Sequence, residues 1–114
     1  MKRWDEAATA FGKSLEIAPK NPDTAFNLGL ILKQGGRLDD AEQAFRHVIP
    51  LNADHADALA ELSESLGRTG KLDEAITLQE RAVTLKPNTA NFHFNLGMLF
   101  LKRPELGQRP YQFQ

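Results

Sequence analysis

Apolar residues recur three and four positions apart along most of the chain, a spacing that is typical of the buried face of an amphipathic helix. Ala25, Leu28 and Leu32 form one such stripe, and Leu59, Leu62 and Leu66 form the next. Glycine, proline and short polar stretches interrupt this apolar pattern. The pattern therefore predicts six helices, over residues 3–18, 22–34, 38–51, 56–69, 72–85 and 90–102.

The pattern repeats with a period of 34 residues. The segment "GRLDDA" begins at Gly36, and "GKLDEA" begins 34 positions later at Gly70. The segment "FNLG" begins at Phe26 and again at Phe94, two periods further on. Repetition at this period indicates a stack of helix pairs, in which each pair buries its apolar faces against its neighbours.

Each period is predicted to contain two helices joined by a tight turn. Gly36 and Gly70 can adopt the positive φ that ends a helix. Asp39 and Asp73 then lie in the first turn of the following helix, where the helix dipole favours a negative charge. Three further residues are expected to cap helix starts: Asn21, Asp54 and Asn88.

Small residues are expected where the two helices of a pair come close, because a large side chain there would push their axes apart. These residues are Gly29, Ala41, Ser63, Ala75 and Gly97.

The segments "AFNLGLIL", "GGRLDDAEQAF", "GKLDEAITLQERAVTLKP", "WDEAATAFGKSLEIAP" and "HFNLGMLF" place bulky, glycine, alanine and aromatic residues at a set spacing. In this spacing the chain resembles the tetratricopeptide repeat (TPR) family. It departs from the family pattern at Ser14, at Ala53 in place of proline, at Ser63 in place of glycine and at Gln79 in place of an aromatic residue.

The resemblance implies an all-α fold, a right-handed superhelical stack of antiparallel helix pairs, which is a TPR solenoid of about six helices. We expect a single array over residues 1–102 and an irregular tail over 103–114. The expected parts of the array are a half repeat at 3–21, full repeats at 22–55 and 56–89, and a half repeat at 90–102.

Composition narrows the classes of partner. The net charge is −1 and the basic residues are scattered, so no nucleic acid partner is expected. No apolar run reaches the roughly 18 residues that a membrane span needs, so no membrane partner is expected. The chain contains no cysteine, so cysteine usage does not indicate whether its compartment is oxidising or reducing. A cytoplasmic location is only the default.

The sequence also lacks the motifs of common catalytic and metal sites, such as a glycine-rich phosphate loop or a nucleophile elbow. His47, His55 and His93 do not share a helix face at the spacing of metal ligands. His93 occupies a bulky position of the repeat, and we expect a packed histidine there. We expect no catalytic residue, no metal and no cofactor, and therefore a protein that is not an enzyme.

By resemblance, the first helix of each pair lines a concave groove that binds a segment of a protein or peptide partner. The candidate groove residues are Asp23, Phe26, Asn27, Leu30, Asp57, Glu61, Glu64, Phe94, Asn95 and Met98. Other inward-facing positions hold Lys33, Ala60, Arg68, Asn91 and Lys102. This groove is apolar at both ends and acidic in the middle, which favours a peptide with basic residues between apolar anchors.

Two binding modes of the family bear on these positions. The positions at which the family's carboxylate clamp uses lysines and asparagines hold Phe26, Leu30, Glu61 and Asn91 here, so that clamp is not expected. Asn27 and Asn95 stand where some arrays, including those of O-linked N-acetylglucosamine transferases, hold a peptide backbone with a ladder of asparagines. Glu61 interrupts the ladder, so this analogy is partial.

An alternative function follows from the terminal helices, because terminal repeats normally carry a polar capping face and neither end shows one. Leu96 and Phe100 are expected to form a terminal apolar face. The chain would then be an assembly element that self-associates through its terminal helices. A further alternative is that the chain is a fragment of a longer TPR array attached to another domain, for example a glycosyltransferase-like one.

Overall fold

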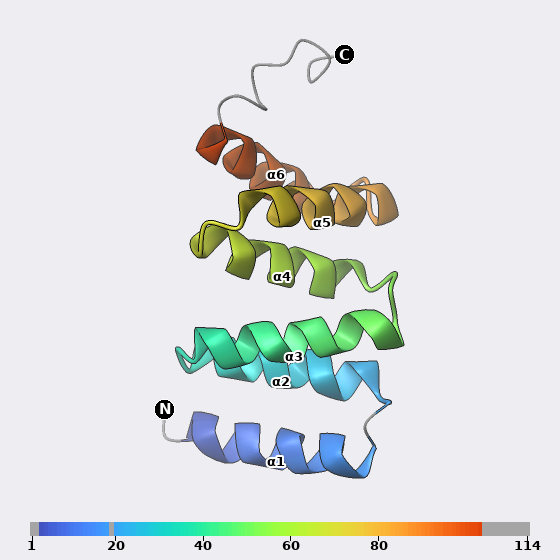
Figure 1. Cartoon of the computed structure of the whole chain (residues 1–114). Helices are drawn as coiled ribbons and strands as arrows, with labels where there is room; N and C mark the ends of the chain where they lie inside the picture. Colours follow the sequence, from blue (N-terminus) through green and yellow to red (C-terminus); the bar gives the residue numbers. More distant parts are fainter. Residues whose placement is uncertain (1–2, 19, 104–114) are drawn as a thin grey trace. The chain divides into compact units, whose positions relative to one another are not determined.

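The computed structural model of the chain describes residues 3–18 and 20–103, and within them it contains six α-helices and no strand (Figure 1). The helices are α1 (Arg3–Ile17), α2 (Pro22–Gln34), α3 (Leu38–Leu51), α4 (Ala56–Arg68), α5 (Leu72–Leu85) and α6 (Ala90–Lys102). All six predicted helices are confirmed, with each boundary within one residue of the prediction. The predicted tail, apart from Arg103, lies outside the described residues.

The chain divides into two compact units, and the boundary between Ala58 and Leu59 falls inside α4. The N-terminal unit contains α1, α2, α3 and the first residues of α4. The C-terminal unit contains the remainder of α4 with α5 and α6. Within the N-terminal unit α2 packs against both α1 and α3, and within the C-terminal unit α5 packs against α6, with neighbouring helices antiparallel (Figure 1).

The core of the N-terminal unit joins residues from different helices. Ala25 of α2, Val48 of α3 and Ala58 of α4 are fully buried and pack together. Because two of the three are alanines, the helices that carry them can approach closely. Partly buried apolar side chains surround this cluster: Leu15, Phe26 and Ile49.

Gly29 marks a close approach of α2 and α3. A Cβ atom built on Gly29 would lie 2.4 Å from Cε1 of Phe45, and Phe45 is itself fully buried. Carbon atoms normally pack at about 3.5–4.0 Å, so even a methyl group does not fit here without movement of the ring. The predicted need for a small residue at Gly29 is confirmed.

Ser63 and Gly97 occupy the position of Gly29 in the following repeats. The Ser63 hydroxyl, which is buried, donates a hydrogen bond of 2.8 Å to the Ala75 carbonyl oxygen and so ties α4 to α5. A Cβ atom at Gly97 would meet nothing within 4 Å in the described part of the chain. The close approach predicted at Gly97 is therefore absent among the described helices, where α6 has no following helix to pack on it.

The two glycine turns have matching geometry. The φ angles are 83° at Gly36 and 85° at Gly70, which are the positive values predicted from the sequence. In both turns the residue after the glycine donates its N–H to a carbonyl five residues earlier, at 2.9 Å. This bond satisfies a carbonyl of the last turn of the helix, as a Schellman cap does.

One of the predicted helix caps is confirmed. The Oδ1 atom of Asn21 accepts hydrogen bonds from the backbone N–H groups of Asp23 at 3.0 Å and Thr24 at 3.3 Å. Pro22 follows at the first helical position, where its missing N–H costs nothing.

The predictions that Asp54 and Asn88 cap helices are wrong. The residue directly before α4 is His55, and its ring Nδ1 accepts a hydrogen bond of 3.1 Å from the Ala58 N–H. The N-cap of α6 is Thr89. In both places the helix begins one residue too late for the Asp or Asn side chain to be the cap.

The prediction of a packed histidine at position 93 is also wrong. His93 is exposed on α6, and its Nε2 lies 2.7 Å from the carbonyl oxygen of Pro87. In a complete repeat a second helix would cover this position, and the described residues contain no helix after α6. The imidazole instead turns to the loop that precedes its own helix.

Gln79 of α5 brings an amide into the core of the C-terminal unit, where the family pattern has an aromatic ring. It is fully buried, and its Nε2 donates a hydrogen bond of 3.0 Å to the Phe92 carbonyl of α6. Its Oε1 has no hydrogen-bond partner in the described part of the chain. An unpaired buried amide oxygen loses its hydration without compensation, which costs stability.

The Gly29 approach can be tested by alanine substitution. Gly29→Ala is expected to lower the free energy of unfolding by about 1–3 kcal/mol, because the buried Phe45 ring must shift. Gly97→Ala is the matched control, since it makes the same change at the same repeat position in open space. It should raise stability by about 0.5–1 kcal/mol through helix propensity. Urea unfolding followed by circular dichroism measures both, and equal effects of the two substitutions would contradict the steric explanation.

The unpaired amide oxygen can be tested at Gln79. Gln79→Met is expected to raise the free energy of unfolding by about 1 kcal/mol, because the unsatisfied acceptor disappears. The Phe92 carbonyl lies inside α6 and keeps its intrahelical donor. The control is Gln43→Met on the exposed surface of α3, expected within about 0.5 kcal/mol of zero. A large destabilisation of Gln79→Met in urea unfolding would show that the amide is fully satisfied.

Candidate functional site

The candidate groove residues lie on α2, α4 and α6, and every one of them retains solvent exposure. Five belong to the N-terminal unit: Asp23, Phe26, Asn27, Leu30 and Asp57. Five belong to the C-terminal unit: Glu61, Glu64, Phe94, Asn95 and Met98. Each unit therefore carries its own set of candidate residues.

Among the candidate residues of the N-terminal unit, Phe26 packs against two other rings. Its ring centroid lies 5.8 Å from that of Phe45 and 4.6 Å from that of the His55 imidazole. The side chain is half-buried by these neighbours, so it presents part of a ring rather than a free anchor. Asp23 and Asn27 on the same helix are exposed.

His55 connects this aromatic group to the start of α4. One edge of its ring accepts the Ala58 N–H, and the ring plane is tilted by 38° against Phe26. A single side chain thus both caps a helix and limits the movement of a candidate groove residue. Sequence reasoning missed this role because histidine is not a preferred N-cap residue.

In the C-terminal unit, α6 exposes an apolar stripe, which consists of Phe94, Met98 and Leu101. Their exposed fractions are 66%, 43% and 72%. Spacings of four and three residues place all three on one face of the helix. Leu101 was not among the candidate residues, although its position three after Met98 was the signal that could have found it.

The other large apolar residues of α6 are more buried than the α6 stripe. Phe92 and Leu99 are buried. Leu96 and Phe100, the candidate terminal face, are half-buried. The most exposed apolar surface of α6 is therefore the stripe, which includes two candidate groove residues.

A cavity of about 200 Å³ lies between α4 and α6. The residues that line this α4–α6 cavity are Ser63, Glu64, Gly67, Arg68, Asn95, Met98, Leu99 and Lys102. A Cβ atom built on Gly67 would lie 3.0 Å from Cδ2 of Leu99 and 3.9 Å from Nζ of Lys102. The absence of a side chain at Gly67 thus makes room for both residues of α6.

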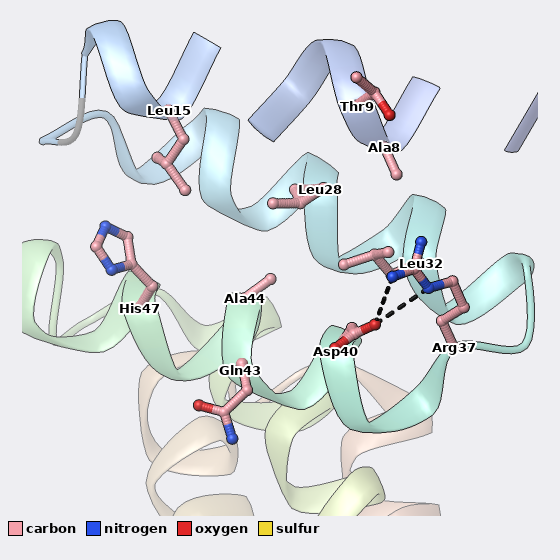
Figure 2. A pocket seen from close by; sticks show the side chains of 10 residues that line it. All are labelled: Ala8, Thr9, Leu15, Leu28, Leu32, Arg37, Asp40, Gln43, Ala44 and His47. Carbon is pink, nitrogen blue, oxygen red and sulfur yellow. Dashed lines mark hydrogen bonds and ion pairs between the residues drawn. The ribbon is translucent and has the colours of Figure 1, made fainter. Parts of the chain in front are cut away.

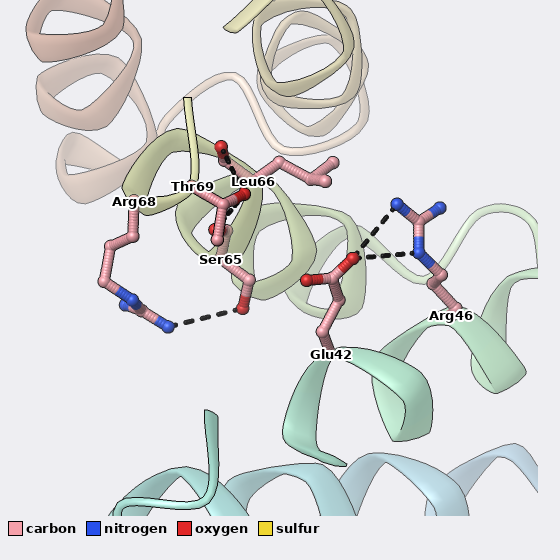
Figure 3. A network of polar contacts seen from close by, with 6 residues as sticks. All are labelled: Glu42, Arg46, Ser65, Leu66, Arg68 and Thr69. Carbon is pink, nitrogen blue, oxygen red and sulfur yellow. Dashed lines mark hydrogen bonds and ion pairs between the residues drawn. The ribbon is translucent and has the colours of Figure 1, made fainter. Parts of the chain in front are cut away.

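The charges around the α4–α6 cavity do not balance. The Arg68 guanidinium lies 3.4 Å from the Glu64 carboxylate. It also donates to the Ser65 hydroxyl at 3.4 Å (Figure 3). Lys102 makes no hydrogen bond or ion pair to any residue that the structure describes. Glu64 and Arg68 offset each other, so the Lys102 ammonium leaves the lining with an excess positive charge.

A larger cavity, of about 470 Å³, lies among α1, α2 and α3 in the N-terminal unit (Figure 2). Its lining residues are Ala8, Thr9, Leu15, Leu28, Leu32, Arg37, Asp40, Gln43, Ala44 and His47. The Arg37 guanidinium donates to the Asp40 carboxylate at 2.8 Å across one part of this lining. The lining contains none of the candidate groove residues, so this cavity lies apart from the predicted binding surface of α2.

Residues 3–18 and 20–103 contain no group of three or more His, Cys, Asp or Glu side chains placed to hold a metal ion. No helix in the same ranges combines the length and the apolar character of a membrane span.

Two family models match the chain. A model described as "Tetratricopeptide repeat" matches residues 1–66, more than half of the sequence, and one described as "TPR repeat" matches residues 64–103. The chain belongs to the tetratricopeptide repeat family. Together with the six helices, this match confirms the predicted all-α TPR solenoid.

Two curated relatives match this chain over a small part of their own length. A peroxisomal targeting signal receptor of Yarrowia lipolytica (strain CLIB 122 / E 150) is 32% identical over 82 residues, which is 71% of this chain and 14% of the receptor. The human protein O-mannosyl-transferase TMTC1 is 31% identical over 99 residues, which is 83% of this chain and 11% of the transferase. The chain thus spans less than a sixth of either relative.

Solved TPR structures share the fold. The crystal structure of MamA has a TM-score of 0.85 at 25% identity, over 90% of this chain and 60% of that one. The first TPR domain of Spaghetti (RPAP3) bound to the HSP90 peptide SRMEEVD has a TM-score of 0.84 at 22% identity, over 90% of this chain and 82% of that one. The second likeness shows the fold alone.

The role of His55 can be tested against the residue that sequence preference favours. His55→Ala is expected to lower the free energy of unfolding by about 1–2 kcal/mol, because it removes a helix cap and a ring contact with Phe26. Asp54→Ala, one residue earlier, is expected to change it by less than about 0.5 kcal/mol. Urea unfolding compares the two, and a larger loss at Asp54 would mean that the carboxylate is the true cap.

Proposed function

We propose that this TPR chain is a protein-interaction module that binds a peptide segment of a partner protein through exposed residues of its helices. The observation that carries the proposal is the α6 stripe, in which Phe94, Met98 and Leu101 leave apolar surface open to solvent. Contiguous exposed apolar surface of this kind is typical of interaction sites. The name of one relative, a targeting signal receptor, supports a peptide as the class of ligand.

The charges on α4 suggest the composition of the peptide. Asp57, Glu61 and Glu64 follow one another at spacings of four and three residues, so they share one face of a continuous helix. A row of carboxylates on that face favours basic residues in the partner through electrostatic complementarity. We therefore propose a peptide with basic residues between apolar anchors, and no catalytic role for these residues.

A peptide array followed by fluorescence anisotropy tests this proposal. Peptides that combine Lys or Arg with Leu or Phe are expected to be enriched over scrambled acidic peptides. Glu61→Lys should weaken the best peptide about 5- to 30-fold, which corresponds to roughly 1–2 kcal/mol. Phe94→Ala should weaken it about tenfold through the loss of an aromatic anchor.

The matched control is Glu80→Lys, which makes the same charge reversal on α5, outside the proposed surface. It should leave the affinity unchanged within about twofold. No enrichment of basic–apolar peptides, or equal effects of the two charge reversals, would contradict the proposal.

Sedimentation velocity of the same samples tests the second candidate function, self-association through α6, which the exposed Leu101 favours. Concentration-dependent dimers abolished by Phe94→Ala would support that candidate instead.

A further inference from the structure

We propose that α1 of a second copy of this chain docks on α6 and completes its repeat, so that copies associate head to tail. The surface that receives α1 is the α6 repeat face, which consists of His93, Leu96, Gly97 and Phe100. This inference rests on the second candidate function only in that copies associate, and it names the two surfaces that meet. It does not depend on the proposed peptide ligand.

The α6 repeat face is open at positions that are closed in the internal repeats. Leu32 and Leu66, at the repeat position of Phe100, are 6% and 0% exposed, whereas Phe100 is half-buried. Ala25, at the repeat position of His93, is fully buried, whereas His93 is exposed. The described residues therefore leave open on α6 a face that the internal repeats cover.

The helix that this face lacks is of the same type as α1. Within the N-terminal unit α2 packs against both α1 and α3 (Figure 1). α6 corresponds to α2 two periods later, since Phe94–Gly97 repeats Phe26–Gly29, and it packs against α5. The described ranges contain no helix after α6 that would correspond to α3. α1 precedes α3 by one period, since Trp4–Ala7 corresponds to Leu38–Ala41, so α1 of another copy can take the place of α3 beside α6.

The contact that separates α2 from α3 has its two halves at the two ends of the chain. The Phe45 ring lies 2.4 Å from a Cβ atom built on Gly29. Gly97 has the repeat position of Gly29, and a Cβ atom there would meet no described atom within 4 Å. Phe11 has the repeat position of Phe45 and is half-buried on α1. Docking would place the Phe11 ring over Gly97, as the Phe45 ring lies over Gly29.

A second matching contact is polar on both sides. In the N-terminal unit Ala25 of α2 and Val48 of α3 are fully buried and pack together. The residues at the same two repeat positions are His93 on α6 and Ser14 on α1, and both are exposed. An imidazole buried against valine would lose its hydration, whereas a serine hydroxyl can hydrogen-bond to it. The two ends thus match each other where each departs from the internal pair.

The charges at the helix ends favour the same antiparallel pairing. In both internal pairs the last turn of the first helix is basic and the first turn of the second is acidic. Likewise, α6 carries Lys102 in its last turn, and α1 carries Asp5 and Glu6 in its first turn. These two carboxylates pair with Arg37 and Arg3 of their own chain at 3.8 and 3.1 Å, but exposed pairs of this kind contribute little. Charge complementarity therefore selects α1 as the occupant and sets its direction.

The two docking surfaces differ, so the contact is heterologous. Each copy has one α6 repeat face and one α1, and occupation of one leaves the other free. Heterologous contacts form rings when the rotation closes and filaments when it does not, whereas a contact between identical faces stops at a dimer. The assembly is therefore expected to grow past a dimer.

Sedimentation velocity of the full chain in a concentration series tests the docking. The average mass should rise with concentration and exceed that of a dimer. Gly97→Leu fills the space over Gly97, and Ser14→Arg places a charge on the docking face of α1. Both positions are exposed, so circular dichroism should show two folded helical variants. Each variant alone should associate at least about tenfold more weakly.

An equimolar mixture of the two variants tests which surfaces meet. Gly97→Leu keeps an intact α1, and Ser14→Arg keeps an intact α6 repeat face, so the mixture should form a dimer of the two variants and nothing larger. This recovery would also show that both variants are folded. The matched control Thr77→Arg adds a charge on the exposed surface of α5 and should associate as the unmodified chain does, within about twofold. Phe94→Ala in the α6 stripe should do the same.

An unmodified chain that stays monomeric throughout the series would overturn the inference, as would a mixture of folded variants that forms no dimer. Loss of association in Phe94→Ala but not in Gly97→Leu would overturn it in favour of a contact through the α6 stripe. The proposed peptide ligand fails on a separate result, since the array depends on basic and apolar residues and on Glu61.

Discussion

The contact between Gly29 and the ring of Phe45 sets the separation of α2 and α3, and the N-terminal unit depends on it. The buried Phe45 ring occupies the space that any side chain at Gly29 would need. Phe45 also lies beside Phe26, whose ring in turn meets His55 at the start of α4. Close-packed interiors transmit displacements from one side chain to the next. A methyl group at position 29 would therefore shift Phe45 and, through it, the candidate binding residue Phe26.

The same repeat position is used differently further along the chain, which shows what a repeat conserves and what it leaves free. At Ser63 the space admits a hydroxyl, and that hydroxyl bonds the facing helix instead of merely avoiding it. At Gly97 no described atom lies close enough to constrain the residue. The 34-residue period fixes the backbone path, because helix length and turn geometry recur. The side chains at each helix interface, however, differ from repeat to repeat. The buried amide of Gln79, which bonds the Phe92 carbonyl, is another example.

Periodicity predicted the helices and the two glycine turns because both depend on features that are local in sequence. The spacing of apolar residues defines a helix face, and Gly36 and Gly70 supply a φ that other residues rarely adopt. The caps at Asp54 and Asn88 failed because a shift of one residue in the helix start decides which side chain faces the free N–H groups. The α4–α6 cavity could not be predicted at all, since it depends on Gly67 and on the direction in which the Lys102 side chain runs.

In the proposed function, the face of α4 contributes selectivity without large area. Its charges change sign between Glu64 and Arg68, and their order is fixed because all belong to one continuous helix. Charged residues on a binding surface contribute more to the choice and register of a partner than to raw affinity. If the proposed peptide bound in the reverse direction, its basic residues would lie against Arg68. Such a like-charge contact would disfavour the reverse orientation of the proposed peptide, while the apolar α6 stripe would supply binding energy in either one.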